Sequence, residues 1–192
     1  MTAEAAPKTA TETVGERELR LTRLIDAPRE AVWRAWTDPE LLKRWFAPLP
    51  YTTPEATFEL RPGGASNIVM QAPDGKRMPN RGQFLEVTPH ERLVFTDAYT
   101  GDWTPREGKP FMTVVLTFED EGGQTRYTAR VLHWTREDRE THETMGFHQG
   151  WAICTEQLAA LVEREALLPG NGERRLMGAS QAGSAPGCSD AS

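Results

Sequence analysis

Four histidines are the side chains in this sequence best suited to acid–base or metal chemistry, and two of them lie close together near its C-terminal end. His142-Glu143 followed by His148 resembles the zinc-protease pattern, in which the second histidine comes four residues after the first. Here it comes six residues later. At about 100° per residue, the two rings then point about 240° apart around a helix. We therefore expect no metal site, with His142 in solvent and His148 partly buried.

His133 lies at the end of a predicted strand, in phase with Tyr127, Ala129 and Val131. If these residues face the interior, His133 enters a cavity there and meets His148 from the C-terminal helix. Two interpretations stay open. Either both histidines are satisfied at the cavity rim, or they orient a polar group of a ligand or exchange a proton with it, because the imidazole pKa allows both protonation states near neutrality.

Six tryptophans are a high number for 192 residues, and most of them are expected to pack in the core or on the surface. Trp151 shares its predicted helix face with His148 and Thr155, which places a flat apolar ring beside polar groups, as in a ligand pocket. The sequence has no phosphate-binding G-x-x-x-x-G-K-[ST] and no G-x-G-x-x-G after a strand. No Ser/His/Asp or Cys/His set can be assembled either, so we predict no cofactor and identify no catalytic residue.

The elements that must position these residues follow from hydrophobic periodicity. Residues 18–25 alternate as a strand does, and Asp26-Ala27-Pro28 and Thr37-Asp38-Pro39 each predict the start of a short helix. From residue 55 to 134 the period is two, interrupted by turn residues, which predicts six further strands, at 57–60, 66–71, 81–87, 92–98, 111–118 and 125–134. Thr135 and Asp138 have the spacing of a capping box, which predicts one long helix continuing to about residue 167.

This order predicts an α+β fold, because consecutive strands on short turns form an antiparallel meander from which the helices are segregated. We expect a curved seven-stranded antiparallel sheet wrapped around the long C-terminal helix, with a pocket where the two do not close tightly. The domain should span 17–167. The composition of 1–16 and 168–192 predicts disordered tails on either side of it.

Composition and charge argue against several classes of protein. The sequence has 22 basic and 28 acidic residues and a net charge of −6, so it lacks the electrostatic attraction needed to bind nucleic acids or anionic membranes. It contains no apolar run of the kind found in signal peptides or membrane spans. Its two cysteines are too few for a disulfide framework. We expect a soluble, cytoplasmic protein.

Five short motifs resemble those of a known family: DAPREAVW at 26–33, WTDP at 36–39, RPGG at 61–64, PDG at 73–75 and GW at 150–151. Over about residues 17–166 the chain resembles the SRPBCC (START-like, Bet v-type) superfamily. Within it, the chain is most similar to the branch named after the C-terminal domain of the activator of heat shock protein 90 ATPase. The resemblance implies a helix-grip fold, in which a curved sheet holds the C-terminal helix and encloses a deep, largely apolar cavity.

Members of this superfamily include lipid or hormone carriers, polyketide cyclases and aromatases, and co-chaperone domains, so the resemblance implies a cavity but no particular reaction. Our leading hypothesis is a binding protein for a small apolar or amphipathic molecule. A cyclase- or hydrolase-type enzyme and a co-chaperone-like regulator of the heat shock protein 90 ATPase are the alternatives. A chaperone partner is not favoured, because such co-chaperones carry an N-terminal docking domain and only 16 residues precede the predicted domain here. A homodimer is compatible with the sequence, although no heptad pattern requires one.

The side chains expected to line the cavity come from the second short helix, the strands and the long helix. They are Trp45, Phe58, Met70, Phe84, Phe95, His133, Phe147, His148, Trp151, Thr155 and Leu158. The loop 99–110, with Trp103 near its centre, is predicted to act as a lid or a contact surface.

Overall fold

The computed structural model describes residues 9–166, so half of the predicted N-terminal tail (1–8) and the whole predicted C-terminal tail lie outside the described residues. The elements follow in the order β1 (Thr9–Val14), β2 (Glu18–Ile25), α1 (Arg29–Thr37), α2 (Pro39–Leu42), β3 (Thr52–Phe58), β4 (Ala65–Gln71), β5 (Arg77–Thr88), β6 (Arg92–Thr96), β7 (Met112–Glu121), β8 (Gln124–His133), α3 (Arg136–Thr144) and α4 (Phe147–Ala166).

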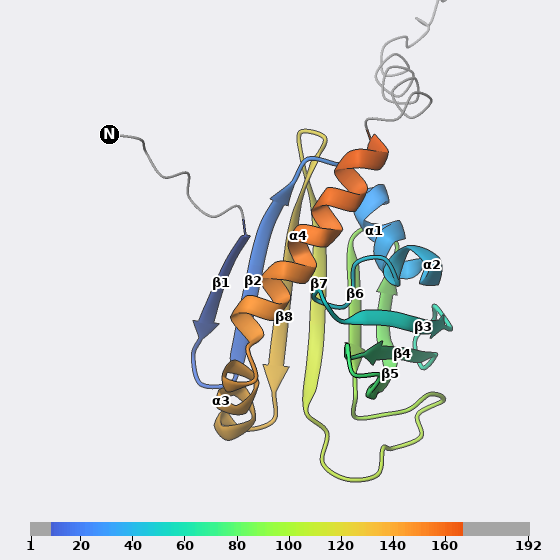
Figure 1. Ribbon diagram of the computed structural model, residues 1–192, viewed down its shortest axis with the longest axis vertical. Helices are drawn as coiled ribbons and strands as arrows, with labels where there is room; N and C mark the ends of the chain where they lie inside the picture. Colours follow the sequence, from blue (N-terminus) through green and yellow to red (C-terminus); the bar gives the residue numbers. More distant parts are fainter. Residues whose placement is uncertain (1–8, 167–192) are drawn as a thin grey trace, which may run out of the picture.

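All the strands form one antiparallel sheet, in the order β1-β2-β8-β7-β6-β5-β4-β3. Figure 1 shows α4 crossing in front of β2 and β8, with α1 and α2 beside its C-terminal half. The α+β class and the sheet held against a C-terminal helix are therefore confirmed. The inward phase predicted for the last strand is also confirmed, because Tyr127, Ala129, Val131 and His133 are all buried.

The sheet has eight strands, not the predicted seven, because Thr9–Val14 pairs with β2 as an edge strand. This segment has little apolar surface to bury, which is why its composition predicted a tail. Its alternate threonines instead form hydrogen bonds with helical side chains: Thr9 with Glu156, Thr11 with His148 and Thr13 with Glu143. Polar contacts with α3 and α4 thus hold β1, which the composition of the sequence did not predict as a strand.

The two short helices form as predicted, but only the second has the predicted cap. Asp38 accepts hydrogen bonds from the backbone N–H groups of Glu40 and Leu41 at the start of α2. The N-cap of α1 is Pro28, with no side-chain cap. Asp26 accepts a hydrogen bond from Gln124 Nε2 instead, at 3.3 Å.

The single long helix predicted after Thr135 is two helices. The capping box of Thr135 and Asp138 is present, but α3 ends before Met145, and Gly146 has a φ of +96°. Such a φ is easily reached only by glycine. The chain therefore changes direction here and α4 begins at Phe147, which resets the phase of the residues that follow.

Most strands differ from their predicted bounds by up to three residues, and β3 and β5 differ by more. The structure places β3 at Thr52–Phe58 where 57–60 was predicted, and Pro54 is tolerated there because β3 is an edge strand. Strand β5 is longer than predicted, at Arg77–Thr88. Among residues 9–166, no helix combines the length and apolar character needed to cross a lipid bilayer.

Candidate ligand cavity

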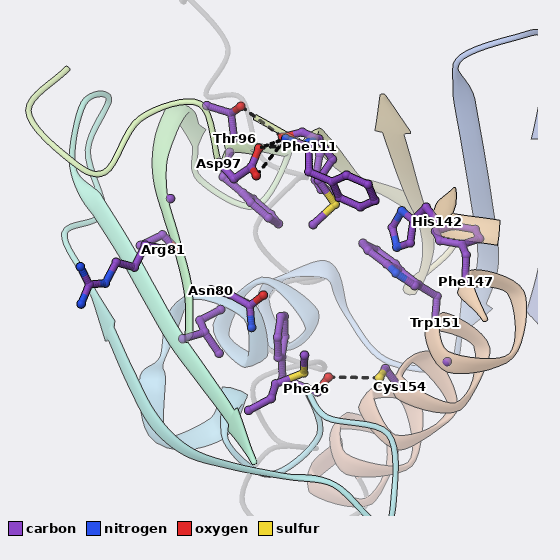
Figure 2. Close-up of a pocket in the computed structure, with 18 of the residues that line it drawn as sticks. Phe46, Asn80, Arg81, Thr96, Asp97, Phe111, His142, Phe147, Trp151 and Cys154 are labelled. Carbon is purple, nitrogen blue, oxygen red and sulfur yellow. Dashed lines mark hydrogen bonds between the residues drawn. The ribbon is translucent and has the colours of Figure 1, made fainter. Parts of the chain in front are cut away.

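A cavity of about 660 Å³ lies between the sheet and the N-terminal half of α4. Figure 2 shows Trp151 and Cys154 on α4 beside this space, with Phe46 hydrogen-bonded to Cys154 and Asn80 farther from the helix. Trp36, Tyr127, Phe95 and Phe111 complete a largely aromatic lining. The antiparallel sheet and α4 thus position the walls, and the segment around α1 and α2 supplies one end.

The aromatic end of the cavity is built by residues from four segments of the chain. The Trp36 ring lies 4.7 Å from that of Trp45, 6.1 Å from that of Phe95 and 6.3 Å from that of Tyr127, measured between centroids. Trp45 donates its indole N–H to the Ala35 carbonyl at 3.0 Å. Burial raises the pKa of the Tyr127 phenol, so this ring is uncharged. The result is a rigid surface that suits flat apolar groups.

The loop before β7 supplies a polar part of the wall. Asp97 accepts hydrogen bonds from the backbone N–H groups of Phe111 and Met112, at 2.9 and 3.0 Å, and pairs with Arg106. This carboxylate therefore ties Arg106 and the C-terminal end of the loop 99–110 to the end of β6. Trp103 does not line the cavity and is 55% exposed. That the loop acts as a lid stays a prediction.

Two histidines contact each other beside the cavity, but they are not the predicted pair. His133 Nε2 lies 3.0 Å from Nδ1 of His142, and both residues are buried. The prediction that His142 lies in solvent is therefore wrong. Burial lowers the pKa of both imidazoles, and the neighbouring His133 contributes to the shift that takes the pKa of His142 to about 4.

His148, in the first turn of α4, contacts β1 and the end of α3. Its ring nitrogens are 3.0 Å from Thr11 Oγ1 on β1 and 3.2 Å from Glu143 Oε1. The predicted contact between His133 and His148 is therefore wrong.

Six of the eleven side chains predicted to line the cavity do so: Trp45, Met70, Phe95, Phe147, Trp151 and Thr155. Phe58 and Phe84 instead form a ring pair, 5.8 Å between centroids, and Leu158 is fully buried in the core. His133 lies behind His142, and His148 contacts β1.

Several lining residues were missed by the sequence reasoning. Trp36 was not distinguished from the tryptophans expected to pack, and Tyr127 was placed in the inward phase of its strand but not among the lining residues. Phe111 and Asp97 lie at the ends of an irregular loop, where no periodic signal exists. In residues 9–166, no group of three or more His, Cys, Asp or Glu side chains is placed to hold a metal ion.

Comparison with solved structures supports the fold. Protein NE0264 from Nitrosomonas europaea is 42% identical, with a TM-score of 0.77, and the match covers 81% of this chain and 100% of that one. Protein Ms6760 from Mycobacterium smegmatis is 25% identical, with a TM-score of 0.69 and coverage of 80% and 95%. Protein CV1439 from Chromobacterium violaceum is 26% identical, with a TM-score of 0.64 and coverage of 76% and 97%.

No curated protein sequence matches the chain significantly. The family model described as Activator of Hsp90 ATPase homolog 1-like protein matches residues 26–163, which extend from just before α1 into α4. That region contains the cavity walls and the helix that covers them. The chain therefore belongs to the family of Activator of Hsp90 ATPase homolog 1-like proteins, within the SRPBCC-type fold.

Proposed function

We propose that this protein binds a small, mostly apolar molecule in the cavity between the sheet and α4. The observation that carries the proposal is the aromatic lining of a space of about 660 Å³. Small-molecule sites typically have volumes of about 300–1,000 Å³ and combine apolar walls with a few polar groups. Here Asp97, Arg106 and His142 are polar groups of that kind, set among tryptophan and phenylalanine rings.

An enzymatic reaction in the same cavity is less well supported. A general base works best when its pKa lies near the operating pH. His142 is the histidine that lines the cavity in the described part of the chain, and its pKa of about 4 makes it a weak base at neutral pH. A neutral, buried imidazole is better suited to recognising a ligand. Regulation of the heat shock protein 90 ATPase stays a prediction that rests on the family description.

The experiment is an NMR titration of the ¹⁵N-labelled protein with 2-methoxynaphthalene, observed at the tryptophan indole N–H groups. The indole signals of Trp36, Trp45 and Trp151 should shift, because these rings line the cavity. Trp103 and Trp134 are about half exposed and lie outside it, so their signals serve as internal controls. Signals that stay unchanged at Trp36, Trp45 and Trp151 would contradict the proposal.

A filled cavity provides the matched control. Gly150 lines the cavity, and a Cβ built on it meets nothing within 4 Å. Gly150→Phe should therefore occupy the space, leave the helix intact and abolish the shifts. Gln149→Phe places the same ring on the exposed side of α4 and should bind the probe like the wild type. Equal binding by all three proteins would locate the probe elsewhere.

A further inference from the structure

A chain of hydrogen-bonding groups runs from the backbone of Arg17 to the cavity. The carbonyl oxygen of Arg17 lies 3.2 Å from His133 Nδ1 and also accepts the backbone N–H of His133 at 2.8 Å. His133 Nε2 lies 3.0 Å from His142 Nδ1. The second ring belongs to the cavity lining, so the chain ends at His142 Nε2.

The donor and acceptor of each hydrogen bond in this series follow from the carbonyl group of Arg17. A carbonyl oxygen only accepts, so the proton of His133 must be on Nδ1. A neutral imidazole carries a single N–H, which leaves His133 Nε2 as an acceptor. His142 must therefore donate through Nδ1, and its own proton is used there. His142 Nε2 is left with a lone pair and no proton.

The surroundings of His133 and His142 favour the neutral form of both imidazole rings. His142 is only 9% exposed and His133 only 5%, and for His133 the effect of burial outweighs the attraction of Asp138 and Glu143 for the charged form. Both pKa values are lowered, that of His142 to about 4. At pH 7 the arrangement of donors and acceptors is therefore fixed.

His142 Nε2 opens into an aromatic environment with no polar group to satisfy it. The imidazole ring is 5.2 Å from the ring of Phe111, 5.1 Å from that of Phe147 and 6.4 Å from that of Trp151, between centroids. Within residues 9–166, Nδ1 is the ring nitrogen of His142 that has a hydrogen-bond partner, and Nε2 has none. Figure 2 shows the His142 ring between Phe111 and Trp151 at the edge of the open space. An unsatisfied acceptor in such a place costs free energy unless a ligand or a water molecule donates to it.

We propose that the ligand of this cavity carries a hydroxyl group on an apolar ring system and donates that hydroxyl to His142 Nε2. This inference rests on the proposed function and specifies the ligand class. The rings of Phe111, Phe147 and Trp151 pack against the apolar skeleton beside the hydroxyl. An ether or a carboxylate at the same place would oppose one lone pair with another and would leave Nε2 unsatisfied.

The test compares 2-naphthol with 2-methoxynaphthalene, which has the same ring system but no donor, in the NMR titration described above. The wild-type protein should bind 2-naphthol roughly 3- to 10-fold more tightly, as expected for one net hydrogen bond. His142→Asn should bind the two probes equally. Its amide can still donate to His133 Nε2, because it occupies the position of Nδ1, but it presents nothing at the position of Nε2.

His148→Asn is the matched control, since His148 contacts Thr11 and Glu143 outside the cavity. This variant should keep the full preference for 2-naphthol. A wild-type protein that binds both probes equally, or a preference that survives in His142→Asn, would overturn the hydroxyl assignment while leaving apolar binding intact. Failure of both probes to bind the wild type would overturn this inference together with the proposed function.

The tautomers can be measured without any ligand. Long-range ¹H–¹⁵N correlation spectra of the imidazole groups at pH 7 should show both His133 and His142 protonated at Nδ1 and unprotonated at Nε2. A proton on His142 Nε2 would make that atom a donor and would overturn the inference directly.

Discussion

Two buried histidines share one hydrogen bond and have no carboxylate between them. Desolvation therefore controls their protonation, and it acts against the charged form of both rings. The neighbouring carboxylate of Glu143 interacts instead with Thr13, Arg139 and His148. The pair is thus a neutral, directional structure at pH 7, and acid should disrupt it.

Acid sensitivity is the residue-scale prediction. Because the folded pKa of His142 lies below its unfolded value of about 6.5, the unfolded chain binds an extra proton between about pH 6.5 and 4. The stabilisation linked to the neutral form of His142 is therefore complete above pH 6.5. As the pH falls toward 4, the free energy of unfolding loses on the order of 3 kcal/mol from this source. Urea unfolding at pH 7 and pH 4 measures this loss.

His142→Asn provides the reference, because carboxylates also titrate in this range and contribute equally to both proteins. The variant should lose less stability than the wild type between the two pH values. Identical losses would show that His142 is not held neutral in the folded protein.

The sequence alone could not place His142. Its neighbours Arg139, Glu140 and Glu143 are charged, which is typical of an exposed helix face. The residues after Thr144 are also compatible with one continuous helix, as the sequence analysis predicted. In the structure the turn at Gly146 separates the two helices, and His142 on α3 contacts His133. The position of His133, by contrast, follows from the alternation of β8, which predicted that this residue faces inward.

At the scale of elements, the junction between α3 and α4 determines which side chains reach the cavity. Met145 is 73% exposed there and Gly146 adopts a backbone conformation that other residues rarely reach. The next residue, Phe147, is buried and begins the face that carries Trp151 and Thr155. A regular helix through this point would rotate that face away from the sheet.

Two glycines four residues apart test this junction. Gly146→Ala should destabilise the protein by about 1–2 kcal/mol, because alanine is strained at a φ of +96°. Gly150→Ala should stabilise it by about 0.5–1 kcal/mol, since Gly150 is in the interior of α4 and its Cβ meets nothing. Chemical denaturation of both variants measures whether each substitution lowers or raises the free energy of unfolding. A neutral or stabilising effect of Gly146→Ala would contradict the role given to the turn.

Strand β1 shows why one element escaped prediction. Sequence periodicity detects elements that bury apolar side chains, and β2, β7 and β8 do so. The threonines of β1 instead donate to or accept from Glu143, His148 and Glu156 on the helices. Such contacts depend on where α3 and α4 lie, and this is known only once the fold has formed.

At the scale of the whole molecule, the sheet and α4 enclose a space that neither fills. The meander of strands and the final helix are predictable from period and turn residues, whereas the volume between them is not. It depends on the curvature of the sheet and on where the aromatic rings of α1, of residues 45–46 and of α4 lie. For that reason six of the predicted lining residues reach the cavity, while Phe58, Phe84 and Leu158 pack elsewhere.

The most direct test of ligand binding in this cavity is a crystal structure of the protein grown with saturating 2-naphthol. The account predicts electron density for the bicyclic ring among Trp36, Phe95 and Trp151, with its hydroxyl within hydrogen-bonding distance of His142 Nε2. Side chains filling the space, or 2-naphthol bound only on the outer surface, would contradict it.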